Sequence, residues 1–197
     1  MQRVLGLEPD LEAPVVGLVT RLAEAKGIGL VIEVLEDLVG EGVQLALLGS
    51  GDARYERSFR AAQERHPGWV SATLSFDPAL ARQVYAGADL FLMPSRTEAC
   101  GLSQMIALRY GTVPIVRETG GLKDTVIDYD EETGEGNGFT FTDYKASQML
   151  EAVMRAVRLY RSKAKWGILV TKAMECDNSW SKSALAYMEM YRELDAL

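Results

Sequence analysis

The sequence predicts an α/β fold in which a Rossmann-like, doubly wound and mostly parallel sheet is followed by a group of helices. Two observations lead to this prediction. Short apolar runs alternate with segments of helical periodicity up to residue 144, and from Lys145 onward only helical periodicity remains. Such alternation favours parallel strands joined by crossover helices on both faces of the sheet. Because no repeat or low-complexity linker interrupts the pattern, we expect residues 1–197 to form one domain, with C-terminal helices from about residue 145.

The predicted strands are apolar runs that end at turn-forming residues. A lead-in, residues 1–13, contains a turn at residues 8–10 and precedes the first run, PVVGLVT. Short apolar runs bounded by Gly, Pro or charged residues are typical of buried strands. The last run is short, and we expect it at an edge of the sheet. The strands are predicted at residues 14–20, 43–48, 69–76, 89–93, 113–116 and 138–141.

The predicted helices carry apolar residues three and four positions apart. In residues 27–39 this spacing is formed by Leu30, Val31, Val34, Leu35 and Leu38. Residues 54–65 are rich in charge, so we expect this helix to be exposed. The helix that opens at Gly101 and stops at Gly111 has its apolar residues at Leu102, Met105, Ile106 and Leu108. The other helices are predicted at 79–86, from Gly121 to Val126, and, beyond an acidic loop at 131–138, at 149–159, 163–173 and 181–194.

The loops after the strands are expected to converge on one cleft, because open parallel sheets bind ligands outside the carboxyl ends of their strands. Two of these loops place small residues where a helix begins. Free backbone N–H groups and a partial positive charge at a helix N-terminus suit an anionic group. The pattern indicates a phosphorylated ligand, although such glycines equally suit simple turns. The converging loops are residues 21–26, 49–52, 76–78, 96–103 and 119–121.

Several side chains in these loops suit a sugar phosphate. An Arg holds a phosphate through two hydrogen bonds and a Lys adds a point charge, so Arg21 and Lys26 together suit a diphosphate. The alternative is that both are solvated surface cations. Glu98 suits sugar hydroxyls or is a solvated loop acid, and Phe76 either stacks on a base or belongs to the core. The run GSGD is not a GxGxxG fingerprint, because Arg54 occupies the place of the third glycine.

The composition excludes other classes of function. The formal net charge is −7 and no run is dense in Lys or Arg, which argues against a nucleic-acid partner. The two cysteines, Cys100 and Cys176, lack metal-ligand or CxxC spacing, and we expect no metal. No apolar run approaches the roughly 20 residues of a membrane span. The first residues lack the apolar core of a signal peptide, so we expect a cytoplasmic protein without membrane association.

Four segments, taken in order, are specific enough to suggest a family. They are VTRLAEAKG, LLGSGD, PSRTEACGLSQMIALRYGTVPIVRETGGLKDTV and GNGFTF. Together they resemble the bacterial glycogen synthase and starch synthase family, retaining glycosyltransferases of the GT-B fold, in which two Rossmann-like domains face a cleft. The resemblance runs from about Val15 to the C-terminal helices. It covers only the C-terminal, nucleotide-sugar-binding domain and implies that the N-terminal GT-B domain is absent from this chain; in a plant it would imply a plastid location.

The resemblance implies a function and a set of site residues. The chain would bind ADP-glucose or UDP-glucose as donor, without a cofactor, for transfer of glucose to the non-reducing end of an α-1,4-glucan. Configuration would be retained because the departing phosphate guides the acceptor to the same face. Arg21 and Lys26 would stabilise the leaving nucleoside diphosphate and Glu98 would lie beside the glucose, as the catalytic residues. The donor would also contact Gly49, Gly51, Phe76, Cys100, Gly101, Leu102, Ser103, Thr119, Gly120 and Gly121.

The sequence also departs from the family pattern. Ile106 stands where many retaining GT-B enzymes carry a second Glu, eight positions after the first. The Lys-x-Gly-Gly-Leu loop of the N-terminal half is not in this chain, so we expect the isolated chain to bind the donor weakly and to be inactive. The alternatives are another retaining GT-B glycosyltransferase and a non-catalytic nucleotide-sugar-binding module. Two features argue against a dehydrogenase-like dinucleotide binder. Arg54 replaces the third glycine, and no acidic residue is placed to bind the ribose.

Overall fold

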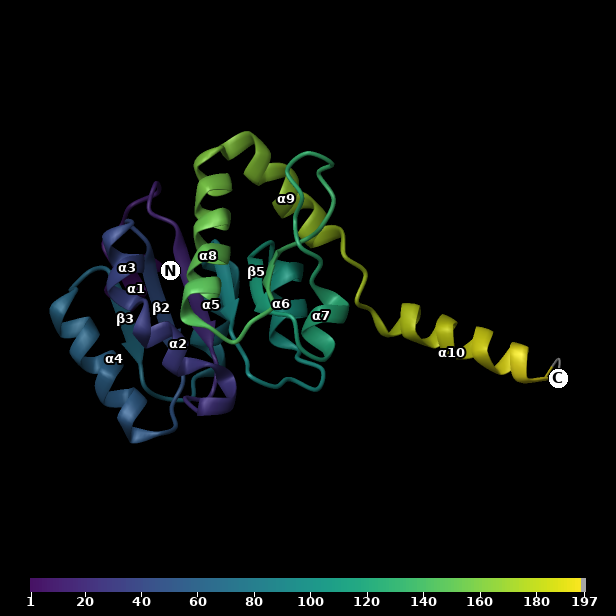
Figure 1. The fold of residues 1–197 in the computed structure, drawn as a ribbon, viewed down its shortest axis with the longest axis horizontal. Helices are drawn as coiled ribbons and strands as arrows, with labels where there is room; N and C mark the ends of the chain where they lie inside the picture. Colours follow the sequence, from purple (N-terminus) through teal and green to yellow (C-terminus); the bar gives the residue numbers. More distant parts are fainter. Residues whose placement is uncertain (196–197) are drawn as a thin grey trace.

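A central sheet with helices on both faces forms the body of the computed structural model, which describes residues 1–195 (Figure 1). The last two residues of the predicted domain, 196–197, lie outside the described residues. Every strand pairs in parallel with its neighbour, in the order β3-β2-β1-β4-β5-β6, so the predicted fold class is confirmed and β6 lies at an edge as expected. The strands are β1 Val15–Val19, β2 Gln44–Leu48, β3 Val70–Thr73, β4 Leu90–Met93, β5 Val113–Arg117 and β6 Phe139–Phe141.

The helices follow the predicted sequence of elements, with a short N-terminal helix added. The predicted helix at 27–39 is interrupted at Val34, whose φ of −109° and ψ of 10° leave the helical conformation, and becomes two short helices. Both halves still turn their apolar residues toward the sheet. The helices are α1 Gln2–Leu5, α2 Ile28–Glu33, α3 Leu35–Gly40, α4 Ala53–Arg65, α5 Pro78–Gly87, α6 Ser103–Tyr110, α7 Gly121–Thr125, α8 Ala146–Arg161, α9 Lys163–Glu175 and α10 Trp180–Asp195.

One expectation about a helix face is wrong, and the buried face of another helix differs from its apolar pattern. The charged helix α4 is not exposed all round, because Phe59 and Ala62 are buried on its inner side. In α6 the buried face consists of Gln104, Ala107 and Leu108, whereas Leu102 before it and Ile106 within it are exposed. The helix also begins two residues later than predicted. Gly101 has a φ of 77°, a left-handed conformation that no helix can include.

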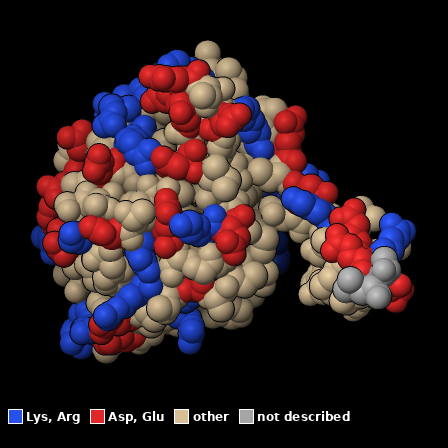
Figure 2. Space-filling view, turned by 45° about the vertical axis from the view of Figure 1, so that its right-hand side comes forward, with Lys and Arg blue, Asp and Glu red and all other residues tan. Residues whose placement is uncertain are grey.

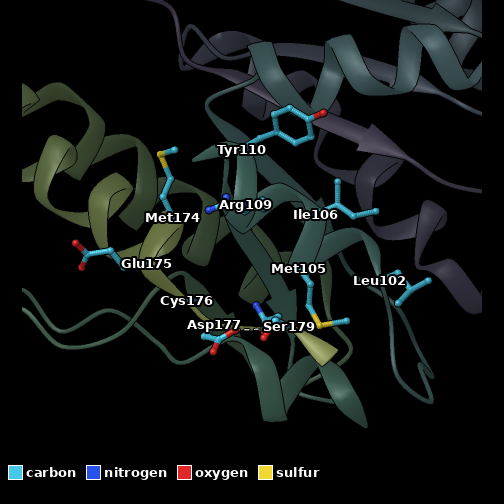
Figure 3. Close-up of a pocket in the computed structure, with 11 residues that line it drawn as sticks. Leu102, Met105, Ile106, Arg109, Tyr110, Met174, Glu175, Cys176, Asp177 and Ser179 are labelled. Carbon is cyan, nitrogen blue, oxygen red and sulfur yellow. Dashed lines mark hydrogen bonds between the residues drawn. The ribbon is translucent and has the colours of Figure 1, made fainter. Parts of the chain in front are cut away.

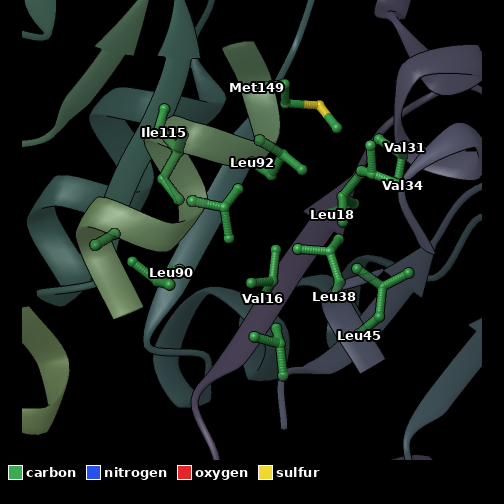
Figure 4. Close-up of a cluster of buried hydrophobic side chains, with 14 of the residues drawn as sticks. Val16, Leu18, Val31, Val34, Leu38, Leu45, Leu90, Leu92, Ile115 and Met149 are labelled. Carbon is green, nitrogen blue, oxygen red and sulfur yellow. The ribbon is translucent and has the colours of Figure 1, made fainter. Parts of the chain in front are cut away.

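The main hydrophobic core lies between one face of the sheet and the helices α2, α3 and α8 (Figure 4). Alternate strand residues such as Leu90 and Leu92 point into it, as the period of two in a strand requires. Phe91, between them, points to the opposite face and packs beside Tyr85 of α5, with the ring centroids 4.9 Å apart. The sheet is therefore covered on both faces, and only the loops at its two ends are free to carry polar chemistry.

The last helix, α10, extends away from the body (Figure 1), and each of its residues is exposed. On the face drawn in Figure 2, acidic and basic side chains are interspersed over the body and over α10. None of the helices within residues 1–195 is both long enough and apolar enough to cross a membrane. The exposed large apolar residues of α10 are Trp180, Leu185, Tyr187, Met188, Met190, Tyr191 and Leu194.

Candidate functional site

The strand order places the candidate site between β1 and β4. From β1 the chain proceeds outward to β2 and β3, and from β4 it proceeds outward in the other direction to β5 and β6. The loops that follow β1 and β4 therefore separate and leave a crevice at the carboxyl end of the sheet, which is where open α/β sheets bind their ligands. Lys26 lies in the loop after β1, and Glu98 lies in the loop after β4.

Lys26 and Glu98 meet across this crevice. The Lys26 Nζ donates to Glu98 Oε2 at 2.5 Å, and Ser95 Oγ donates to the same oxygen at 3.2 Å. The two charged side chains are only 22% and 14% exposed. Both charges are thus largely removed from water and compensated by each other, which costs more free energy than a surface pair would. A ligand that offers a phosphate to Lys26 and hydroxyl groups to Glu98 would satisfy both.

Close backbone packing sets the distance between the two loops. Gly27 has a φ of 72°, and a Cβ at this position would lie 1.9 Å from the carbonyl oxygen of Pro94. The Arg96 N–H donates to the carbonyl of Ala25 at 2.8 Å, which fastens the same two loops. The glycine after Lys26 is therefore required for packing as well as for backbone conformation, and it brings the ammonium group within reach of Glu98.

Two cavities adjoin at this position. One, of about 300 Å³, is lined by both members of the ion pair, with Gly101 and Leu102 beside them. The other, of about 320 Å³, lies over the carboxyl ends of β1 and β2 and is lined by Arg21, Gly49 and Phe76 among others. Together they offer a charged compartment next to a more apolar one, a shape that suits a ligand with a phosphate group and an aromatic ring. The cavities share Val19, Thr20 and Ser103.

The second cavity has an exposed aromatic ring and a partly buried pair of hydroxyl groups. Phe76 is 90% exposed, so the alternative that it belongs to the core is wrong. Tyr85 donates from its hydroxyl to Ser103 Oγ at 3.0 Å. Burial raises the pKa of Tyr85, although the bond to Ser103 acts in the opposite direction. Tyr85 therefore remains a protonated donor at neutral pH and fixes the position of Ser103 at the start of α6.

The glycines of the other loops bring backbone segments together. A Cβ at Gly49 or Gly51 would lie 1.7 Å and 2.4 Å from the carbonyl oxygens of Thr20 and Leu22, respectively. In the same way Gly120 and Gly121 lie against the backbone of residues 98–100. Gly49, Gly101, Leu102 and Ser103 line the two cavities, whereas Gly51 and the remaining predicted contacts line neither of them. Those remaining residues are Cys100, Thr119, Gly120 and Gly121.

Arg117, which the sequence analysis did not single out, holds the loop that carries Glu98. It lies at the end of β5 and donates from Nε to the carbonyl of Ser95 at 2.9 Å and from Nη1 to the carbonyl of Thr142 at 3.1 Å. Its other terminal nitrogen donates to the carbonyl of Arg96. An Arg that ends an otherwise apolar run, as in VPIVR, was the sequence signal available for this role.

A larger cavity, of about 980 Å³, lies on the outer side of α6 against residues 174–179 (Figure 3). It shares Leu102 with the Lys26–Glu98 cavity, and most of its lining is apolar, including Met105, Ile106 and Met174. Because it lies away from the carboxyl ends of the strands, we do not assign the ligand to it. Within residues 1–195 no three His, Cys, Asp or Glu side chains lie close enough to bind a metal ion together.

Comparison with known proteins agrees on one family. The family described as "Glycosyl transferases group 1" matches residues 6–172. The chain is 53% identical over 194 residues to a glycogen synthase of Bacillus anthracis and 50% identical to one of Desulforamulus reducens; it covers 41% and 40% of their lengths, and the match covers 98% of this chain. Among solved structures, the catalytic domain of starch synthase IV from Arabidopsis thaliana, bound to ADP and acarbose, superposes with a TM-score of 0.88 at 39% identity. That match covers 98% of this chain and 41% of the other.

Proposed function

Since the chain belongs to the glycosyl transferases group 1 family, we propose that it is the donor-binding domain of a glycogen or starch synthase. The complete enzyme transfers glucose from ADP-glucose, or from UDP-glucose, to the non-reducing end of an α-1,4-glucan and retains the configuration of the sugar. The glycogen synthase relatives support this proposal, and the ADP in the similar plant structure favours ADP-glucose.

The observation that carries the proposal is the Lys26–Glu98 ion pair. It lines one of two adjoining cavities, at the point between β1 and β4 where the strand order changes direction. In the donor complex the diphosphate takes the place of Glu98 as the partner of Lys26, and Arg21 adds a second cation. Their charge stabilises the diphosphate as its bond to the sugar breaks. Glu98, released from Lys26, accepts hydrogen bonds from the glucose hydroxyls, and the base extends toward Phe76 in the second cavity.

The transfer step needs no nucleophile from this chain in the proposed mechanism. The bond between the anomeric carbon and the diphosphate oxygen breaks, and the acceptor hydroxyl attacks the same face. The departing phosphate oxygen takes the proton of that hydroxyl, so the products are the nucleoside diphosphate and a glucan longer by one glucose. The side chains contribute position and charge stabilisation.

The acceptor and part of the donor site are assigned to the remainder of the enzyme. The chain spans 41% of the Bacillus relative that it matches, and we propose that a second domain closes the cleft over the bound donor. The chain by itself binds the donor weakly and does not turn it over. Supplying the remainder of the enzyme restores turnover.

Titration of the ¹⁵N-labelled chain with ADP, UDP, ADP-glucose, UDP-glucose and NAD tests the proposal. We expect ADP and ADP-glucose to shift the amide signals of residues 49–52 and 101–103. The Lys26→Ala chain serves as the matched control and should respond less to every diphosphate. A response to NAD alone would indicate a dinucleotide-binding protein instead, and no response to any of the five ligands would contradict the donor site as drawn.

A further inference from the structure

The side chain of Gln104 is fully buried beside the loop that carries Glu98, so it makes no contact with solvent. Its Nε2 donates to the carbonyls of Cys100 and Gly101 at 3.2 Å and 2.9 Å, and to Thr125 Oγ1 at 3.0 Å. Its Oε1 is a buried polar atom without a partner among the described residues. A buried amide with an unpaired oxygen destabilises the fold, which is reason to look for a functional role.

The contacts of Gln104 determine the direction of two backbone N–H groups. In a trans peptide the C=O and the N–H of one unit point in opposite directions, and residues 1–195 contain no cis peptide bond. The carbonyls of Cys100 and Gly101 point at Gln104. The N–H groups of the same two peptide units, which belong to Gly101 and Leu102, therefore point away from it. Within residues 1–195 neither N–H donates to a protein acceptor.

Both residues line the cavity that contains Lys26 and Glu98, and Leu102 also lines the larger cavity beside α6. In the arrangement proposed below, the two N–H groups that point away from Gln104 face the Lys26–Glu98 cavity. They stand directly before α6, where the N-terminal partial positive charge of the helix adds to the Lys26 ammonium group. Backbone donors of this kind suit phosphate oxygens, and they suit them only while both peptide units keep their direction.

We propose that Gln104 is a positioning residue that holds the Gly101 and Leu102 N–H groups toward the diphosphate of the donor. The inference rests on the function proposed above. Gly101 fits the same role, because its φ of 77° turns the loop and a Cβ there would lie 2.5 Å from Gln104 Oε1. An amide at position 104 and a glycine at position 101 thus depend on each other.

Thr125 connects this arrangement to the second glycine loop and supplies a matched control. Its hydroxyl accepts from Gln104 and donates to the carbonyl of Gly121 at 2.6 Å. Thr125→Val removes the hydrogen bonds of the hydroxyl to Gln104 and to the carbonyl of Gly121, but it leaves both of the carbonyl contacts of Gln104 that direct the peptide units. Gln104→Met keeps the length of the side chain and removes both carbonyl contacts as well. If Gln104 had only a structural role, the two variants would show the same preference for a phosphorylated ligand over an unphosphorylated one.

The test compares the affinities of ADP and adenosine for the wild-type, Gln104→Met and Thr125→Val chains. Adenosine lacks the diphosphate, so the ratio of the two affinities reports on phosphate binding alone. We expect Gln104→Met to lower this ratio about tenfold or more, since hydrogen bonds to charged groups are lost. Thr125→Val should leave the ratio within about twofold of wild type, although its melting temperature falls.

The outcomes separate the two proposals. If the wild-type chain binds ADP no better than adenosine, the proposed donor site fails and this inference fails with it. If the wild type prefers ADP and Gln104→Met keeps the same preference, only the role of Gln104 is overturned. If Gln104→Met does not fold, a second measurement on the wild-type chain still tests the inference. In the wild type, ADP but not adenosine should shift the Gly101 and Leu102 amide protons and slow their exchange, and unchanged signals would overturn the inference.

Discussion

A carboxylate lies before strand β4 and another lies in the loop after it. The two differ in the group that donates a hydrogen bond to them. Asp89, before the strand, accepts a hydrogen bond from the backbone N–H of Val15 at 2.9 Å. Glu98, in the loop after the strand, is paired with the Lys26 side chain of another loop. A backbone partner is permanent, whereas a side-chain partner on a separate loop is one that a ligand can replace. The comparison distinguishes a carboxylate that holds the sheet from one that is available to a substrate.

The contrast extends to the two ends of the sheet. At the amino end, the single hydrogen of the buried Thr112 hydroxyl is shared between the carbonyls of Tyr85 and Ala88. At the carboxyl end, the polar groups of Lys26 and Arg21 line cavities. Substitutions at the amino end should therefore change stability, and substitutions at the carboxyl end should change turnover.

The largest effect is expected for Lys26→Ala in the complete enzyme. Loss of one preorganised charge next to the leaving diphosphate should lower kcat by about 100-fold to 1,000-fold. The melting temperature should also fall, because Glu98 is only 14% exposed and would lose the cation that compensates its charge, so kcat is compared per folded molecule. Steady-state kinetics and thermal unfolding measure the two quantities, with Lys26→Arg as the charge-retaining control. A kcat equal to that of the wild type, together with a large loss of melting temperature, would remove Lys26 from the mechanism.

At the amino end we expect the opposite result for Thr112→Val. The substitution keeps the shape of the side chain and leaves two buried carbonyls without their hydroxyl donor, which should cost about 1–3 kcal/mol of unfolding free energy. Turnover per folded molecule should equal that of the wild type. Denaturant unfolding and an active-site titration measure the two. A fall in kcat of the folded enzyme would show that the amino end takes part in catalysis.

A smaller and pH-dependent effect is expected for Asp89→Asn. Burial raises the pKa of Asp89, and the hydrogen bond from Val15 opposes the shift only in part. A raised pKa means that the folded state binds the proton more tightly, so this stability is present in acid and is lost as the pH rises through the folded pKa. An Asn has no such dependence. The variant should match the wild type in acid and be more stable at neutral pH, as urea unfolding at both pH values would show; equal stabilities at neutral pH would contradict this.

The smallest effect is expected for Glu36→Gln on the surface. Hydrogen bonding to Arg65 lowers the pKa of Glu36, and His66 contributes in the same direction. Stability from a lowered pKa is present above the unfolded value and lost as the pH falls. Because all three groups lie near the surface, water and salt weaken the attraction. We expect no measurable change of melting temperature in physiological salt, and a clear loss there would show that this cluster is more than a surface ion pair.

The architecture was predictable because most strands are compact apolar runs that end at turn-forming residues. The parallel arrangement, the edge position of β6 and the end of α7 at Thr125, one residue before the predicted Val126, follow from these signals. The interruption at Val34 was not predictable, because its neighbours keep helical spacing on both sides. Hydrophobic spacing did not separate the buried face of α6 from its exposed face, because only Leu108 of the apolar pattern is fully buried. The exposed Leu102 and Ile106 carry the apolar pattern, and the buried face contains Gln104.

Part of the candidate site was predictable as a set of residues but not as a set of contacts. Arg21, Lys26 and Glu98 were recognised from their loops, and their catalytic roles remain predictions. That Lys26 and Glu98 pair with each other depends on Gly27 packing against Pro94, a contact between residues far apart in sequence. The same limit applies to Arg117 and Gln104, whose partners are backbone carbonyls, and carbonyl directions leave no trace in side-chain types.

The strand order has a consequence for how the chain folds. β1, β2 and β3 pair with neighbours that follow closely in the sequence, but β1 also needs β4 on its other side, and the bonded pair Val15 and Asp89 lies 74 positions apart. Closing so long a segment costs chain entropy before any contact repays it, and non-local pairing slows folding. On the ribosome the first three strands emerge well before β4. One edge of β1 therefore has no strand to pair with until β4, just before the loop that carries Glu98, has been synthesised.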